Sequence, residues 1–370
     1  MIRLAIRNLF QNRTRLMISV GGVALALMLI LSLDGIVRWI QTRVAAYIDA
    51  SEADIWVAQS GVRNMHMASS SLSSERALEV GRVEGVDSVT PILYLTNVVV
   101  AGEERTIAYI IGLPEEAQAG RPWIVSAGRG DPGPGGAVID QGIAEASGIG
   151  LGDRVELLGA DFEVVGLSGG TTSLTNSIAF ISSQDFARLR ASPDTVSFLL
   201  VRVVAGESPE EVARRIEDRV DGVTAQTREE FSAQERKVVR DMSTDLVTIM
   251  NSVGFLIGLA VMGLTVYTAT ISRRAEYGVL KALGARSRDL YLSVGVQALA
   301  SVALGLAAGL AFTLLLAGIV PRIVSNLGLQ VSLESLGKVT VASLIFAGTA
   351  ALLPIRQIRG LDPAQVFRGK

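Results

Sequence analysis

Four stretches of this chain contain no charged side chain, and each is long enough to cross a lipid bilayer. A spanning helix needs about 17–25 mostly apolar residues, and only the last stretch is as short as that lower limit. Hydrophobic residues make up 49% of the chain and charged residues only 19%, which also favours a membrane protein. We therefore expect an α-helical membrane region of four transmembrane helices. They are predicted at residues 16–36, 246–272, 290–321 and 339–355.

The first stretch differs from a signal peptide. Its uncharged run from Leu16 to Leu33 exceeds the roughly 7–15 residues of a signal peptide's apolar part, and no convincing small-x-small cleavage site follows it. Beyond the run, Asp34, Arg38 and Arg43 continue a helical pattern together with apolar residues. We therefore expect an uncleaved helix that projects beyond the membrane.

Charge assigns the segments to the two sides of the membrane. Residues 1–15, 273–289 and 356–370 together carry a net charge of +10, whereas residues 34–245 carry −13. Positive charge near the ends of spanning helices favours the cytoplasmic side. The chain is thus predicted to be a multi-pass protein of the cell (inner) membrane with both termini in the cytoplasm. Its other parts are an extracytoplasmic stalk and domain (37–245), a cytoplasmic segment (273–289), an outer loop (322–338) and a cytoplasmic tail (356–370).

Composition removes several classes of function. With no cysteine, the chain forms no disulfide, no Cys-ligated zinc site and no Fe–S cluster. A single histidine argues against a Ser-His-Asp triad, and a net charge of −2 argues against a nucleic-acid partner. Ion-coupled transport usually needs charged groups inside the membrane. The uncharged spans argue against it.

The chain also lacks the loop that cradles nucleotide phosphates, because no segment matches G-x-x-x-x-G-K-[ST]. The signature loop of ABC ATPases is imitated by Leu167-Ser168-Gly169-Gly170-Thr171, but this segment lies on the predicted outer side, away from cytoplasmic ATP. We interpret it as a structural turn. The chain is therefore predicted not to be an enzyme and to bind no cofactor of its own.

The region outside the membrane has an α/β pattern. Two helix–turn–strand units, near 78–90 and 208–224, weakly echo each other, and the second begins with the strong helix start Ser208-Pro209-Glu210-Glu211. Two such units with partner strands predict a split βαβ, ferredoxin-like layer, with chance similarity as the alternative. A β-rich insert is predicted at about 121–190. Residues 228–245 are predicted to be a helix that leads directly into the second span.

The most specific feature is the cytoplasmic segment Arg273-Arg274-Ala275-Glu276-Tyr277-Gly278-Val279-Leu280-Lys281-Ala282-Leu283-Gly284-Ala285. A short helix with Val279, Leu280 and Leu283 on one face can dock in a groove of a partner. Glu276 can pair with a base of that partner or with Arg273 or Lys281, and Gly284 would end the helix. The alternative is a basic loop held at the membrane surface by lipid headgroups. The residues alone favour neither interpretation.

This segment resembles the hallmark R-R-x-E-[IY]-G-x-L-[KR]-A-[LI]-G-A of the FtsX-like, or MacB-type (type VII), ABC transporter permease family. The tail from Pro354 to Arg368 resembles the family's other end signature, and Ala5-Ile6-Arg7-Asn8-Leu9 resembles its cytoplasmic amphipathic N-terminal helix, here residues 1–15. One helix, a large outer domain and three helices follow the order of the DevC-like four-helix subset. The resemblance covers essentially the whole chain and favours docking to an ATPase over the lipid alternative.

The resemblance implies a permease subunit that works with a second permease copy, two copies of an ABC ATPase and the surrounding membrane lipids. The ATPase would bind ATP and Mg, and its closing would move the 273–285 helix and, through the spans and stalk, the outer domain. Such mechanotransmission would export or extract a hydrophobic or amphiphilic substrate, with a periplasmic adaptor as a possible partner. The alternative is a non-transporting FtsX-like regulator of cell-wall hydrolases. The implied ATPase-coupling residues are Arg273, Arg274, Glu276, Tyr277, Gly278, Val279, Leu280, Lys281, Leu283 and Gly284.

A second candidate site surrounds the only histidine of the chain. His66 stands between Met65 and Met67 in a polar outer loop, and imidazole with thioethers suits copper or haem iron. Similar outer segments occur in haem-exporting relatives of the family, so haem or copper efflux is a further alternative. The competing interpretation is a loop or dimer contact in which methionine packs and histidine is solvated. Trp39 and Trp56 are interpreted as interfacial anchors or as part of a hydrophobic mouth.

Overall fold

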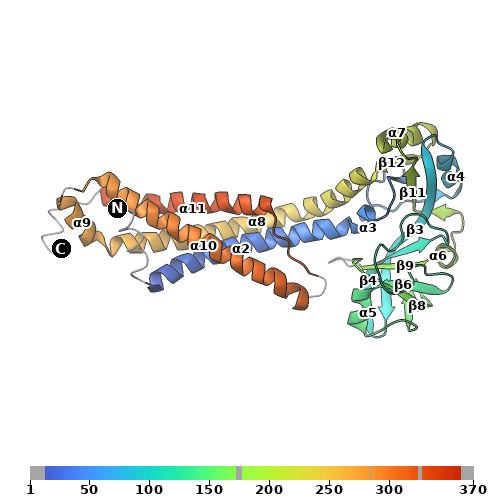
Figure 1. Ribbon diagram of the computed structural model, residues 1–370, viewed down its shortest axis with the longest axis horizontal. Helices are drawn as coiled ribbons and strands as arrows, with labels where there is room; N and C mark the ends of the chain where they lie inside the picture. Colours follow the sequence, from blue (N-terminus) through green and yellow to red (C-terminus); the bar gives the residue numbers. More distant parts are fainter. Residues whose placement is uncertain (1–12, 172–176, 284, 324–326, 360–370) are drawn as a thin grey trace. The chain divides into compact units, whose positions relative to one another are not determined.

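The computed structural model describes residues 13–171, 177–283, 285–323 and 327–359, which divide into two compact units (Figure 1). The helical unit contains the described parts of 1–39, 243–324 and 328–370. The α/β unit contains the described parts of 40–242 and 325–327. Two helices, α2 (Arg13–Val44) and α8 (Arg228–Ile271), run without a break from one unit into the other.

The helical unit is built from long apolar helices. Besides its parts of α2 and α8, it contains α9 (Arg274–Ala282), α10 (Ser287–Ile323) and α11 (Leu333–Arg359). Within the described part of the chain, three segments are long and apolar enough to cross a membrane: Leu16–Val44, Arg228–Ile271 and Ser287–Ile323. The fourth predicted span, 339–355, lies inside α11, and its crossing of the membrane stays a prediction.

Two glycines bring α2 and α10 close together. A Cβ atom on Gly305 would lie 2.6 Å from Val23, and one on Gly309 would lie 2.9 Å from the carbonyl oxygen of Ala24. Small residues allow the backbones of membrane helices to approach in this way. The pair Gly305 and Gly309 therefore has a packing role, and Val23 belongs to the buried core of the helical unit.

The predicted ferredoxin-like layer is confirmed in the α/β unit. Its strands are β1 (Ile55–Gln59), β3 (Val86–Ala101), β11 (Phe198–Val203) and β12 (Val223–Thr227). They lie in the order β12-β1-β11-β3, and each adjacent pair is antiparallel. Helix α4 (Glu75–Gly81) precedes β3, and α7 (Pro209–Arg219) connects β11 to β12, which completes the split βαβ pattern. The hydroxyl of Ser208 accepts a hydrogen bond from the backbone N–H of Glu211 and caps α7, as its sequence predicts.

The insert between β3 and β11 starts earlier than the expected residue 121. The first part of the 16-residue strand β3 pairs with β11, and its second part pairs with β4 (Glu104–Leu113). The hairpin turns at Gly102, whose φ of 62° suits glycine. From β4 the sheet continues in the order β9-β6-β8-β5. The bounds are β5 Val125–Gly128, β6 Gly136–Asp140, α5 Gln141–Ser147, β7 Arg154–Leu157, β8 Ala160–Ser168, β9 Ser177–Ser182 and α6 Ser183–Arg190.

Three short elements complete the α/β unit. Helix α3 (Ala46–Asp49) follows α2, and strands β2 (Leu72–Ser73) and β10 (Thr195–Val196) pair with each other apart from the large sheet.

Aromatic side chains fix the start of α8 to the sheet. Trp56 on β1 is fully buried, and its ring stacks on Phe231 of α8 with the ring centroids 5.0 Å apart. The expectation that Trp56 lies at a membrane interface or at a hydrophobic mouth is therefore wrong, because this side chain belongs to the domain core. Trp39 packs within the helical unit, where its ring lies so close to Gly328 that a Cβ atom there would clash.

Candidate functional site

Helix α9 is the candidate site for a partner protein. It begins at Arg274, directly after α8 ends at Ile271, and it leads into α10. An acidic residue in its first turn, Glu276, and a basic one in its last turn, Lys281, have the signs that the helix dipole favours. Nη1 of Arg273 lies 3.7 Å from Oε2 of Glu276, so one of the pairings expected for Glu276 is present.

One side of α9 is built into the core of the helical unit. Tyr277 is only 3% exposed and lies in the same buried cluster as Met262 of α8 and Val294 of α10. Burial raises the pKa of its hydroxyl above the ordinary value. Leu280 packs against the same cluster. Tyr277 and Leu280 therefore anchor α9 to the two long helices on either side of it in the sequence.

The other side of α9 carries exposed apolar side chains. Leu283 is 80% exposed, and Val279 and Glu276 are exposed beside it. The expectation of one face with Val279, Leu280 and Leu283 is therefore corrected, because Leu280 faces the core. Residues 276, 279 and 283 follow one helical stripe, whereas Tyr277 and Leu280 follow the adjacent one. Because both stripes contain apolar residues, hydropathy alone does not show which one faces inward.

The remaining predicted coupling residues occupy mixed positions. Gly278 is buried and Lys281 is half-buried. The side chain of Arg274 and the whole of Gly284 lie outside the described part of the chain, and their roles stay predictions.

The three residues of the predicted haem or copper site do not converge. Met65 is buried in the core of the α/β unit, whereas Met67 is 68% exposed. Nδ1 of His66 contacts Oε1 of Glu235 on α8, and its Nε2 contacts the hydroxyl of Tyr109 on β4. Among the described residues, no three His, Cys, Asp or Glu side chains are grouped as a metal site. The neighbours of His66 are thus a carboxylate and a phenol, and haem or copper binding by the three residues stays a prediction.

The segment 167–171, which imitates an ATPase signature, forms a turn that is stabilised by hydrogen bonds between buried side chains. The carboxylate of Asp140 caps α5 by accepting a hydrogen bond from the backbone N–H of Gly142 at 2.8 Å. The hydroxyl of Thr171 donates to the same carboxylate, and the hydroxyls of Ser168 and Thr171 lie 2.8 Å apart. These three side chains are buried. This geometry fits the interpretation as a structural turn.

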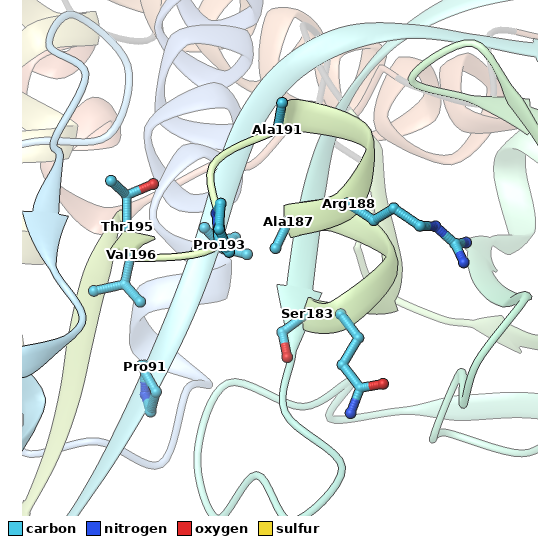
Figure 2. Close-up of a pocket in the computed structure, with 10 residues that line it drawn as sticks. Pro91, Ser183, Ala187, Arg188, Ala191, Pro193, Thr195 and Val196 are labelled. Atoms are coloured by element: carbon cyan, nitrogen blue, oxygen red, sulfur yellow. The ribbon is translucent and has the colours of Figure 1, made fainter.

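A hollow of about 500 Å³ beside α6 was not expected from the sequence (Figure 2). Its wall is mainly apolar and combines α6 with residues of β3 and β10. The charged end of Arg188 extends away from Thr195 and Val196, which lie across the hollow (Figure 2). The apolar part of the wall comes from scattered alanine, proline, leucine and valine residues, so no local pattern predicts it. Its polar lining consists of the side chains of Ser183, Gln184, Arg188 and Thr195.

Two family descriptions match the chain. Residues 16–219 match the MacB-like periplasmic core domain, and residues 248–363 match the FtsX-like permease C-terminal domain. The second match includes α9 with both of its stripes.

Relatives match over the full length. An ABC transporter permease from Mycobacterium tuberculosis is 23% identical over all of both chains. Another from Methanocaldococcus jannaschii is 22% identical over all of this chain and 98% of the relative. Two solved structures are also similar to part of this chain. The periplasmic region of MacB from Actinobacillus actinomycetemcomitans has a TM-score of 0.40, with 13% identity over 50% of this chain and 94% of that one. The extracellular domain of the transporter YknZ from Gram-positive bacteria has a TM-score of 0.36, with 16% identity over 47% and 100%.

Proposed function

Since the chain belongs to the family of FtsX-like, MacB-type ABC transporter permeases, we propose that it couples ATP hydrolysis by a separate ATPase subunit to movement of its outer domain. As an ABC transporter permease it is a membrane protein that works with an ATPase partner. ATP and Mg would be bound by that partner, since the sequence of this chain contains no phosphate-cradling loop.

The two-sided helix α9 is the observation that carries this proposal. Its outer stripe of Glu276, Val279 and Leu283 offers two exposed apolar side chains beside a carboxylate, which fits the groove of a partner protein. Its inner stripe of Tyr277 and Leu280 is packed in the core of the helical unit. A push on the outer stripe is therefore passed to α8 and α10, because close-packed cores transmit displacement.

Helix α8 can carry that displacement to the outer domain. It is one 44-residue helix whose end adjoins α9 and whose start is embedded in the α/β unit. There Phe231 stacks on Trp56, and the carboxylate of Asp49 accepts a hydrogen bond from Nη1 of Arg236 at 2.9 Å. A helix held at both ends supports mechanotransmission.

Helix α2 is attached to the α/β unit in a similar way. Nη1 of Arg43, in its last turn, donates a hydrogen bond to the carbonyl oxygen of Gly170 at 3.0 Å. Directly after α2, the hydroxyl of Tyr47 donates to the carbonyl oxygen of Gly120 at 3.0 Å. Both bonds reach loops of the insert, so the insert would respond to movement of this helix.

The charge distribution supports an arrangement with four spans and both termini in the cytoplasm. It favours α9 on the side where ATP is available and the acidic residues 34–245 on the outer side. We propose that the outer domain expels a hydrophobic or amphiphilic substrate, with a periplasmic adaptor as a further partner.

An exposed seam on α8 supports a homodimer. Within the helical unit, Leu246, Ile249, Val253 and Leu256 are all exposed, and their spacing alternates between three and four residues. Their neighbours Met250 and Ile257 are exposed as well, so this part of α8 offers a broad apolar surface that a second helix can cover. A second copy of the chain would place its own α8 against this seam.

A charge on the outer stripe tests the docking proposal. We expect Leu283→Asp to lower co-purification with the co-expressed cognate ATPase at least tenfold and to abolish stimulation of ATP hydrolysis. Leu151→Asp, at an exposed leucine of the α/β unit, is the matched control and leaves both unchanged. If Leu283→Asp inserts normally into the membrane and retains full ATPase binding and stimulation, α9 is not the docking helix.

A further inference from the structure

The hollow beside α6 lies between two parts of the α/β unit. One wall is α6, which belongs to the insert, and the others come from β3 and from residues 191–196, which lead to β11 of the ferredoxin-like layer. Its volume of about 500 Å³ falls in the range of roughly 300–1,000 Å³ that is usual for small-molecule sites. A molecule bound there would touch both the insert and the ferredoxin-like layer.

Hydrogen bonds hold the walls of the hollow in place. The carbonyl oxygen of Asp194 accepts from the backbone N–H of Ser74 at 2.9 Å, and β10 pairs with β2. Directly after β10, the backbone N–H of Ser197 donates to the carbonyl oxygen of Ile92 on β3 at 2.8 Å. The hollow is therefore formed without a ligand, as small-molecule sites usually are.

The apolar surface of the hollow is recessed. Leu93 is only 8% exposed and Val196 is half-buried, so these side chains form a wall and do not project from the unit. Pro91 and Pro193 add apolar surface, and proline has no backbone N–H that would need a partner. An exposed apolar patch suits the surface of a partner protein, whereas a recessed one is reached by a small molecule. The hollow thus favours the apolar body of a small ligand.

The polar groups of the hollow suit an uncharged ligand. Hydroxyls are supplied by Ser183 of α6 and Thr195 of β10, and the Thr195 hydroxyl donates to the carbonyl oxygen of Ser192 at 3.3 Å, which leaves its oxygen as an acceptor. Among the residues that line the hollow, the charged one is Arg188, which is ion-paired with Asp185. Its charged end extends away from Thr195 (Figure 2). An ion in the hollow would therefore lose hydration without gaining a partner of opposite charge.

We propose that this hollow is a binding site for an uncharged amphiphile. The apolar body of the ligand lies against Leu93, Val196 and the side of α6, and a hydroxyl or carbonyl group of the ligand bonds to Ser183 or Thr195. Such a ligand connects α6 to β10 and holds the insert against the ferredoxin-like layer. This binding goes beyond the proposed coupling to an ATPase and does not depend on it.

Protection from thiol labelling, measured on the full chain in lipid nanodiscs without an ATPase, tests the site. Ala187→Cys places a single thiol in the wall of the hollow, since the native chain contains no cysteine. The probes share one bicyclic body: borneol is neutral, bornylammonium is the cation and camphorsulfonate is the anion. We expect saturating borneol to slow labelling by N-ethylmaleimide about fivefold, whereas the two ions leave the rate unchanged.

Leu151→Cys, at an exposed leucine of the same unit, is the matched control, and borneol should not change its labelling rate. Replacing both hydroxyls of the Ala187→Cys chain, by Ser183→Ala and Thr195→Val, should raise the borneol concentration for half protection about fivefold. If Ala187→Cys does not fold, Gln184→Cys replaces it, because Gln184 also lines the hollow. Equal protection by the ions, or no protection by borneol, would overturn the proposal. Because no ATPase is present, such a result leaves the docking of α9 untouched.

Discussion

Helix α9 and the site around Glu235 stand at the two ends of α8, and they are built in opposite ways. On α9 the apolar side chains of Val279 and Leu283 are exposed. Around Glu235 the charge is enclosed and compensated by other parts of the chain. Exposed apolar residues mark a surface that another molecule covers, whereas a compensated buried charge is already satisfied. The contrast teaches that α9 is available for association, while the charge of Glu235 is already satisfied within the chain.

The largest loss of stability is expected when a large side chain is removed from the core of the α/β unit. Trp56→Ala removes the ring that stacks on Phe231, and we expect the α/β unit to lose about 3–5 kcal/mol of unfolding free energy. Denaturant unfolding of the full chain in nanodiscs, followed by hydrogen exchange of β1, measures this loss. Met67→Ala, an exposed position of the same unit, should change it by less than about 0.5 kcal/mol. Equal losses would contradict the placement of Trp56 in the core.

Substitutions on the two stripes of α9 should differ almost as much in the unfolding free energy that they cost. Tyr277→Ala opens a cavity in the helical unit and should cost about 2–4 kcal/mol, whereas Leu283→Ala should cost less than about 0.5 kcal/mol. Thermal unfolding of both variants in nanodiscs compares them directly. A larger cost for Leu283→Ala would reverse the assignment of the inner and outer stripes.

The contrast between inner and outer positions also applies along α10. Gly309→Leu places a side chain against the backbone of Ala24, and we expect a loss of about 1–3 kcal/mol or separation of α2 from α10. Gly318→Leu is the matched control on the same helix, since a Cβ atom there meets nothing within 4 Å. The difference in melting temperature between the two variants is the measurement, and no difference would argue against the close approach of α2 and α10.

The smallest effect is expected at an exposed ion pair of the helical unit, outside the predicted spans. Lys338 and Arg38 hold the pKa of Glu334 at about 2, below the ordinary value of 4.5. Because the folded pKa is lowered, the stabilisation is present above pH 4.5 and is lost as the pH falls toward 2. The difference in melting temperature between the native chain and Glu334→Gln should therefore be small and constant from pH 5 to 8 and should disappear near pH 2. A difference that changes between pH 5 and 8 would contradict this account.

Much of the fold follows from local sequence signals. The uncharged runs predict the long helices, and the start Ser208-Pro209 predicts α7 with its cap. The ferredoxin-like layer follows from two helix–turn–strand units. The continuity of β3 was not predicted, because Pro91 stands in its middle and proline usually interrupts a strand.

The sites are less predictable, because they depend on contacts between distant residues. His66 meets Tyr109 and Glu235, which lie 43 and 169 positions further along the chain, and no local pattern joins them. On α9 the helix itself is evident from the sequence, but the direction of each stripe depends on the packing of α8 and α10. Only the fold shows that Leu280 faces inward and Leu283 outward.

Cross-linking from single cysteines tests the central claim most directly, since the native chain contains no cysteine. A photoactivatable thiol-reactive cross-linker would be attached in turn to Leu283→Cys and Leu280→Cys, each in the full permease with its cognate ATPase. We predict that position 283 forms a cross-link to the ATPase and position 280 forms a cross-link within the permease. Cross-linking to the ATPase from position 280 alone, or from neither position, would contradict docking through the outer stripe of α9.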